Sequence, residues 1–125
     1  MNVPAELKYT SDHEWIRVEG DTATIGITDY AQGELGDVVF VELPGVDETF
    51  DKGDVAATIE AVKTVADVFL PLGGSIEAVN EKLDDTSELI NQDAYGEGWI
   101  LKIKMNDASE LDGYMTAEEY TASIS

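Results

Sequence analysis

The chain of 125 residues contains no cysteine. Disulfide bonds, thiolate metal sites and cysteine nucleophiles are therefore excluded. Any thiol chemistry in which this protein takes part would need sulfur from a prosthetic group.

Histidine is almost as scarce, since His13 is the only one. A hydrolase triad with the nearby Ser11 is not supported, because triad members converge from distant segments and no nucleophile-elbow pattern is present. We therefore predict a hydrogen-bonded structural role for His13.

Basic residues are few, with 7 Lys and Arg against 27 Asp and Glu and a net charge of −20. Without a basic patch, neither nucleic-acid binding nor binding to an anionic membrane is expected. No apolar run approaches the ~20 residues of a membrane span. The negative charge would steer a basic partner toward the protein, or it would only keep the protein soluble, and both readings stay open.

Metal and phosphate sites also lack their usual patterns. Asp84-Asp85 and the turn at residues 51–54 carry carboxylates, but neither has the ligand spacing of a calcium-binding EF-hand. Glycines 73–74 and 96–98 are not followed by the residues that a phosphate-binding loop requires. We therefore expect no metal site.

What the chain does contain is a series of short strand patterns separated by turns. The expected strands are residues 14–18, 22–27, 38–43, 55–62, 65–70, 75–80 and 99–105. Thr28 is placed to cap a short helix that stops at Gly36, residues 86–91 suit one helical turn, and Thr116 begins a capping box for a C-terminal helix. Seven or eight short strands with peripheral helices predict one mainly β domain over residues 1–125, a sandwich or flattened barrel.

Residues 54–74 form the most distinctive stretch. Only Lys63 and Thr64 separate two apolar runs, 55–62 and 65–70, so Lys63 lies where a tight hairpin would turn. Strand alternation would place residues 55, 57, 59 and 61 on one face and residues 56, 58, 60 and 62 on the other. No other basic residue lies between Lys52 and Lys82, so the pattern predicts an isolated, projecting ammonium group.

This hairpin, with Glu60, Lys63, Asp67 and Gly74, resembles the attachment hairpin of lipoyl-carrying domains. The wider chain is similar to the glycine cleavage H-protein family from about residue 7 to residue 120. The segments that carry this resemblance are SDHEW (11–15), IGITDYAQ (25–32), LGDVVFVELP (35–44), EAVN (77–80), LIN (89–91) and YGEGW (95–99).

The resemblance implies a barrel-sandwich hybrid of two small antiparallel sheets with peripheral helices. It implies that lipoate is attached as an amide to Lys63, and that Glu60, Asp67 and Gly74 help the attaching enzyme to accept the hairpin. It also implies a surface cleft for the loaded arm, with acidic contacts at Glu14 and Asp67 and with Asp12 beside it.

The resemblance further implies a non-catalytic carrier, not an enzyme, with several enzyme partners. These are glycine decarboxylase (P protein), the tetrahydrofolate-dependent aminomethyltransferase (T protein), dihydrolipoyl dehydrogenase (L protein) and the lipoyl-attaching enzyme. The family pattern begins close to Met1 with no evident targeting segment, so we expect a monomer in a bacterial cytoplasm, or in the mitochondrial matrix for a processed eukaryotic form.

Two alternatives remain at this point. One is a different swinging-arm carrier. Ala61-Val62-Lys63 partly matches the Ala-Met-Lys of biotin carriers, and the lipoyl domains of 2-oxoacid dehydrogenases favour Asp where this chain has Val62, but the long N-terminal match fits neither class. An unmodified acidic scaffold is the other alternative, because the family usually has Ser at positions 61 and 66, where this chain has Ala, and Ser at 73, where it has Gly.

Overall fold

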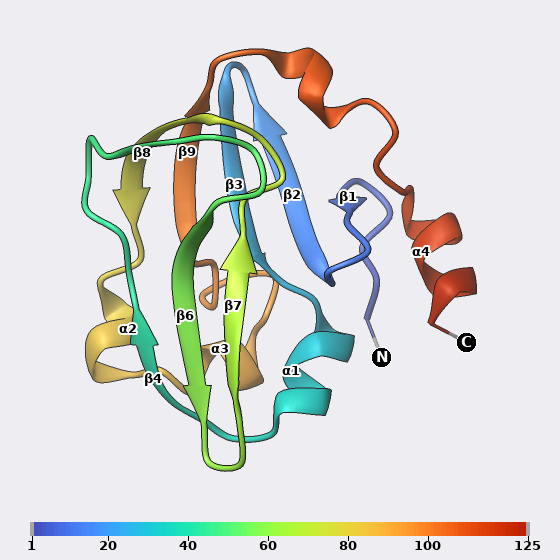
Figure 1. Cartoon of the computed structure of the whole chain (residues 1–125). Helices are drawn as coiled ribbons and strands as arrows, with labels where there is room; N and C mark the ends of the chain where they lie inside the picture. Colours follow the sequence, from blue (N-terminus) through green and yellow to red (C-terminus); the bar gives the residue numbers. More distant parts are fainter. Residues whose placement is uncertain (1, 125) are drawn as a thin grey trace.

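Strands dominate the computed structural model, which describes residues 2–124. Short helices lie at the edges of the two sheets (Figure 1). In chain order the elements are β1 (Lys8–Tyr9), β2 (Glu14–Glu19), β3 (Thr22–Ile27), α1 (Asp29–Leu35), β4 (Val38–Glu42), β5 (Thr49–Phe50), β6 (Val55–Ala61), β7 (Val65–Phe69), β8 (Gly74–Val79), α2 (Lys82–Asp85), α3 (Leu89–Gln92), β9 (Leu101–Met105), a 3₁₀ helix (Ala108–Leu111) and α4 (Ala117–Ser123).

The strands form two antiparallel sheets, as expected. The larger sheet has the order β1-β2-β3-β9-β8-β5, and the smaller has the order β4-β6-β7. Figure 1 shows the β6–β7 hairpin in front of β3 and β9, with its turn projecting at the bottom of the view. The smaller sheet therefore has one face against the larger sheet and one face toward solvent.

The main core lies between the two sheets. Ile25 and Ile103 of the larger sheet and Ile59 and Val68 of the smaller one are at most 1% exposed and belong to one apolar cluster. Burying each such side chain stabilises the fold by about 1.5–3 kcal/mol. Alternating branched residues are thus the main reason why these segments form paired strands.

A bulge changes the predicted alternation at the start of β6. The pairing with β7 shifts between Val55 and Ala57, and both Ala56 and Ala57 are buried while Val55 is exposed. From Ala57 onward the predicted alternation is correct. The prediction for residues 55 and 56 was wrong because a bulge inserts one extra residue into the strand, so that the residues before it point to the opposite faces of the sheet.

A second apolar cluster fastens the N- and C-terminal segments to the outside of the larger sheet. It contains Tyr9, Trp15 and Tyr120 together with Leu7, Ala94 and Tyr95. The rings of Tyr9 and Tyr120 stack with centroids 4.8 Å apart, and the Trp15 indole donates to the Ala94 carbonyl at 2.9 Å. Trp15, the last residue of the SDHEW segment, thus packs β2 against this cluster.

The helix ends follow the sequence closely. The Thr28 hydroxyl accepts from the Ala31 N–H, Gly36 ends α1 with φ of 80°, and Thr116 and Glu119 form the predicted capping box. The single turn expected at residues 86–91 is present as α3, shifted toward its C-terminal end, whereas α2 was not predicted. Strands β1 and β5 were not predicted, because two residues are too few to show alternation. None of the helices within residues 2–124 is both long and apolar enough to cross a lipid bilayer.

Gly26 allows the Trp15 ring to pack flat against β3. A Cβ on Gly26 would lie 2.7 Å from three indole atoms, whereas a Cβ on Gly33 in α1 would meet no atom within 4 Å. We predict that Gly26→Ala lowers the free energy of unfolding by about 1–3 kcal/mol. Gly33→Ala should raise it by about 0.5–1 kcal/mol, because alanine favours helix. Urea denaturation of both variants tests this, and equal effects would contradict the packing role of Gly26.

Candidate functional site

Lys63 lies at the turn of the β6–β7 hairpin and is exposed. The Ala61 N–H donates to the Thr64 carbonyl at 2.8 Å and closes the turn, while the Val62 N–H donates to the Asp37 carbonyl at 3.0 Å. The second bond ties the turn to the segment before β4, so the base of the lysine is held in place while its side chain remains accessible.

The Lys63 side chain extends toward the end of helix α1. A Cβ on Gly36 would lie 3.3 Å from the Lys63 Cε, and the φ of 80° at Gly36 also favours glycine. The lysine stem thus passes over a position without a side chain, one residue after Leu35, which lines a cleft.

This cleft has a volume of about 320 Å³ and lies between α1 and the β6–β7 hairpin. Its apolar lining comes from Ile27, Ala31, Leu35, Ile59, Ala66 and Val68. Its polar lining comes from Asp12, His13, Glu14, Tyr30, Glu34 and Asp67. An apolar arm and a terminal cation would both find suitable surroundings here.

Glu14 is the most unusual residue of the cleft, since it is only 2% exposed. Its Oε2 accepts from the Phe69 N–H at 2.7 Å, and its Oε1 accepts from the Thr10 hydroxyl at 3.3 Å. Burial, together with the nearby charge of Asp12, raises the pKa of Glu14 to about 8, although the two hydrogen bonds oppose the shift. Near neutral pH this carboxyl therefore holds a proton for much of the time, and a cation in the cleft would favour its ionised form.

His13 has the hydrogen-bonded role that was predicted. Its Nδ1 lies 2.9 Å from the Tyr120 hydroxyl, which lies 2.7 Å from the Thr28 hydroxyl, and its ring lies 4.8 Å from that of Tyr30. The backbone of His13 has φ of 66°. Because this chain of contacts joins β2, α1 and α4, it also fixes one wall of the cleft.

The structure separates the predicted site residues into three groups. Asp12, Glu14 and Asp67 line the cleft. Glu60 is instead exposed and pairs with Phe40 and Val65 in the smaller sheet, outside the cleft.

Gly74 lies apart from both the cleft and Glu60. It is buried at the start of β8 and pairs with Phe50 and Met105. A Cβ there would collide with the Lys104 carbonyl, so strand packing alone requires glycine at this position. Any effect of Gly74 on the attaching enzyme therefore stays a prediction, and it would act through the path of the chain after the hairpin.

Tyr30, Ala31, Glu34 and Leu35 line the cleft although the sequence analysis did not single them out. Their spacing of one, three and four residues places them on one face of a helix, which is the signal that could have found them. Among residues 2–124, no group of three or more His, Asp or Glu side chains is arranged to hold a metal ion.

An isolated lysine at a hairpin turn, on a small two-sheet β domain and beside a cleft that could shelter an attached arm, defines a swinging-arm carrier domain. Residues 7–125 match the family model described as glycine cleavage H-protein. The chain is 56% identical over 124 residues to the glycine cleavage system H protein of Bacteroides thetaiotaomicron, covering 99% of this chain and 98% of that one. It is 54% identical over 120 residues to that of Halothermothrix orenii, covering 96% and 94%.

A solved structure agrees with these relatives. The crystal structure of a glycine cleavage system H protein from Mycobacterium marinum has a TM-score of 0.89 and 37% identity, with 98% of each chain covered. The chain therefore belongs to the glycine cleavage H-protein family. It is a lipoyl carrier component of glycine cleavage and not itself a catalyst.

The raised pKa of Glu14 makes stability depend on pH. Its folded-state pKa of about 8 exceeds the ordinary value of 4.5, so between these values the folded protein binds more protons than the unfolded chain. The contribution of this group is fully present below pH 4.5 and is lost as pH rises toward 8, at up to about 1.4 kcal/mol per pH unit. We predict that Glu14→Gln flattens this decline.

Urea denaturation at several pH values across this window measures the effect. Glu88→Gln is the control, because Glu88 is exposed. The same slope for the wild type and Glu14→Gln would show that Glu14 titrates normally.

Proposed function

We propose that the Lys63 ammonium is the attachment point for lipoate, joined as an amide, and that residues 1–125 act as one carrier domain. The single observation that carries this proposal is the position of Lys63, which is exposed at the hairpin turn and has its side chain against Gly36, one residue after Leu35 of the cleft of about 320 Å³. Membership of the H-protein family supports the same lysine.

The attached group would supply a disulfide that accepts the aminomethyl group from glycine decarboxylase, delivers its carbon to tetrahydrofolate on the aminomethyltransferase, and is reoxidised as a dithiol by dihydrolipoyl dehydrogenase. The chain itself supplies a handle, a docking surface and a shelter. Acylation removes the Lys63 charge, taking the net charge from −20 to about −21. An extended lipoyl-lysine should reach about 14 Å, which holds its sulfur atoms at roughly millimolar concentration near a docked enzyme.

The cleft suits such an arm in two respects. Ile27, Leu35 and Val68 offer apolar surface to a hydrocarbon chain. Asp12, Glu14 and Asp67 offer carboxylates to a protonated amine at its end. Because Glu14 is buried and holds a proton readily, an incoming cation would be exchanged for that proton, and the cleft would gain no net charge.

Attachment requires an enzyme that accepts the hairpin. Glu60 and Asp67 lie on β6 and β7, three residues before and four residues after the lysine, and both are exposed. They are therefore available to such an enzyme, whereas the buried Gly74 would influence it only through the backbone.

Intact mass spectrometry tests the attachment directly. After incubation with a lipoate ligase, lipoate and ATP, the wild-type chain should gain about 188 Da, the increment of one lipoyl group. Lys63→Arg keeps the charge but cannot be acylated in this way, and it should gain nothing.

The other outcomes point to the alternatives. A gain of about 226 Da with a biotin ligase would indicate a biotin carrier. No gain with either ligase would leave an unmodified acidic scaffold, and a gain that persists in Lys63→Arg would move the attachment to another lysine.

A further inference from the structure

The outer face of the β4-β6-β7 sheet exposes apolar side chains that a folded domain normally covers. Among residues 2–124, the large apolar side chains that remain exposed lie between residues 39 and 69, with Val18 as the one exception. Five of them belong to these three strands: Val39, which falls at the irregularity of the β4–β6 pairing, and four paired residues, Phe40, Val55, Val65 and Phe69, which are 37–57% exposed. Several large apolar side chains exposed on one sheet make that sheet a candidate interaction site.

The strand register gathers these side chains on one face. Phe40 pairs with Glu60, which pairs with Val65, and Val55 pairs with Phe69. Between these two rows lies a third, formed by Glu42, Thr58 and Asp67. We call these eight residues the outer face. No lysine or arginine occurs in β4, β6 or β7. The charged side chains of the outer face are therefore all acidic, and they lie among apolar ones.

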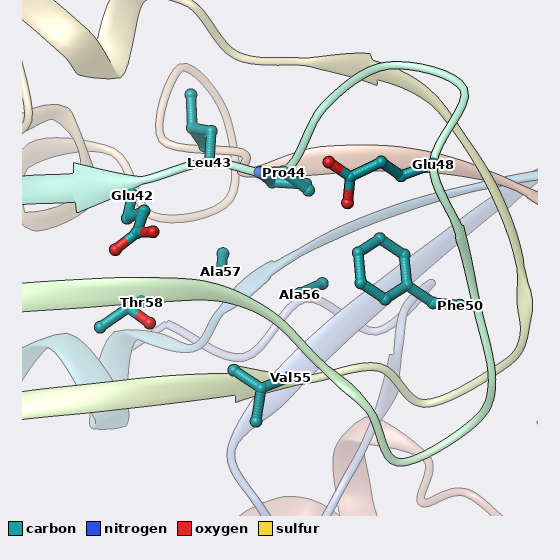
Figure 2. Close-up of a pocket in the computed structure, with 9 residues that line it drawn as sticks. All are labelled: Glu42, Leu43, Pro44, Glu48, Phe50, Val55, Ala56, Ala57 and Thr58. Atoms are coloured by element: carbon teal, nitrogen blue, oxygen red, sulfur yellow. The ribbon is translucent and has the colours of Figure 1, made fainter.

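A pocket of about 320 Å³ continues the outer face at its end far from the hairpin turn. Its floor is formed by Ala56 and Ala57, and Figure 2 shows both alanines between the Glu42 side chain and the Phe50 ring. Glu48 also lines it, and its Oε1 accepts from the Gly45 N–H at 3.1 Å. An apolar floor between two carboxylates fits the aliphatic stem and cationic end of a lysine or arginine side chain.

The distance from this pocket to Lys63 indicates the kind of partner. Thr58, which lines the pocket, lies five residues before Lys63, or about 17 Å along a strand. An arm of about 14 Å can reach an enzyme that acts on its end without contact between that enzyme and the sheet. The attaching enzyme must approach Lys63 itself, because its substrate is the Lys63 ammonium. It therefore comes close to the outer face, which begins at that turn.

We propose that the outer face docks the enzyme that attaches lipoate, and that the pocket receives a lysine or arginine side chain of that enzyme. The inference rests on the proposed function, since it assumes that Lys63 is acylated. The acidic side chains, which lie between apolar ones, require a partner that carries basic groups next to apolar side chains. A second copy of this chain does not meet that requirement, because it also carries a net charge of −20.

Binding of purified lipoate ligase to a Lys63→Arg chain tests the docking separately from the modification, since this chain cannot be acylated at position 63. In this background, Glu42→Gln with Glu48→Gln should weaken the dissociation constant measured by calorimetry about tenfold. The glutamine carbonyl can still accept from the Gly45 N–H, so the loop is retained. The matched control is Glu19→Gln with Asp21→Asn, which removes the same charge at exposed positions of the β2–β3 turn, and it should change the constant by less than roughly twofold.

The apolar part of the outer face has its own matched pair. Val55 is 44% exposed and Val18, on β2, is 42% exposed. Val55→Ser should weaken ligase binding about fivefold, since it removes an apolar contact at the interface. Val18→Ser should leave it unchanged.

Equal binding by the pocket variant and the wild-type surface would overturn the proposal. So would equal weakening by the pocket variant and its charge-matched control, which would indicate long-range steering alone. Self-association that is lost in Val55→Ser, with ligase binding intact, would assign the face to a second copy. If the ligase binds as expected but the wild-type chain gains no lipoyl mass, the docking stands and the proposed attachment fails.

Discussion

The hydrogen bond between the Phe69 N–H and the buried Glu14 carboxyl, 2.7 Å long, joins the two sheets beside the cleft. Strand β7 is an edge strand of the smaller sheet, and an edge amide that is removed from water needs a partner. Glu14, at the start of β2, supplies it from the larger sheet. One contact thus fixes the hairpin against the larger sheet and places a proton-binding group in the cleft.

This arrangement costs the protein some stability, because burial raises the pKa of Glu14 to about 8. A carboxyl that served only as a hydrogen-bond acceptor would cost less folding free energy if it were ionised and in contact with water. Glu14 lines the cleft together with Asp12 and Asp67, so a cation bound there would offset part of this cost. Under the proposed function, Glu14 would exchange its proton for such a cation.

The two faces of the smaller sheet have different roles. Its inner face contributes Ile59 and Val68 to the main core, while its outer face exposes Phe40, Val65 and acidic side chains. The hairpin is therefore rigid on one side and available on the other. A carrier needs both properties, because its lysine must be presented at a constant position while different enzymes approach it.

Local patterns in the sequence determined the strands of the hairpin, the Lys63 turn, the Thr28 and Thr116 caps and the glycine that ends α1, because each depends on residues near one another in the chain. The bulge at Val55–Ala57, the two-residue strands β1 and β5 and the shared lining of the cleft by α1, β2 and β7 were decided only by tertiary structure. The same is true of Glu14 and Gly74. Glu14 and Gly74 are buried by contacts with Phe69 and Lys104, which lie far away in the chain. A local sequence pattern does not indicate which distant segments will pack together.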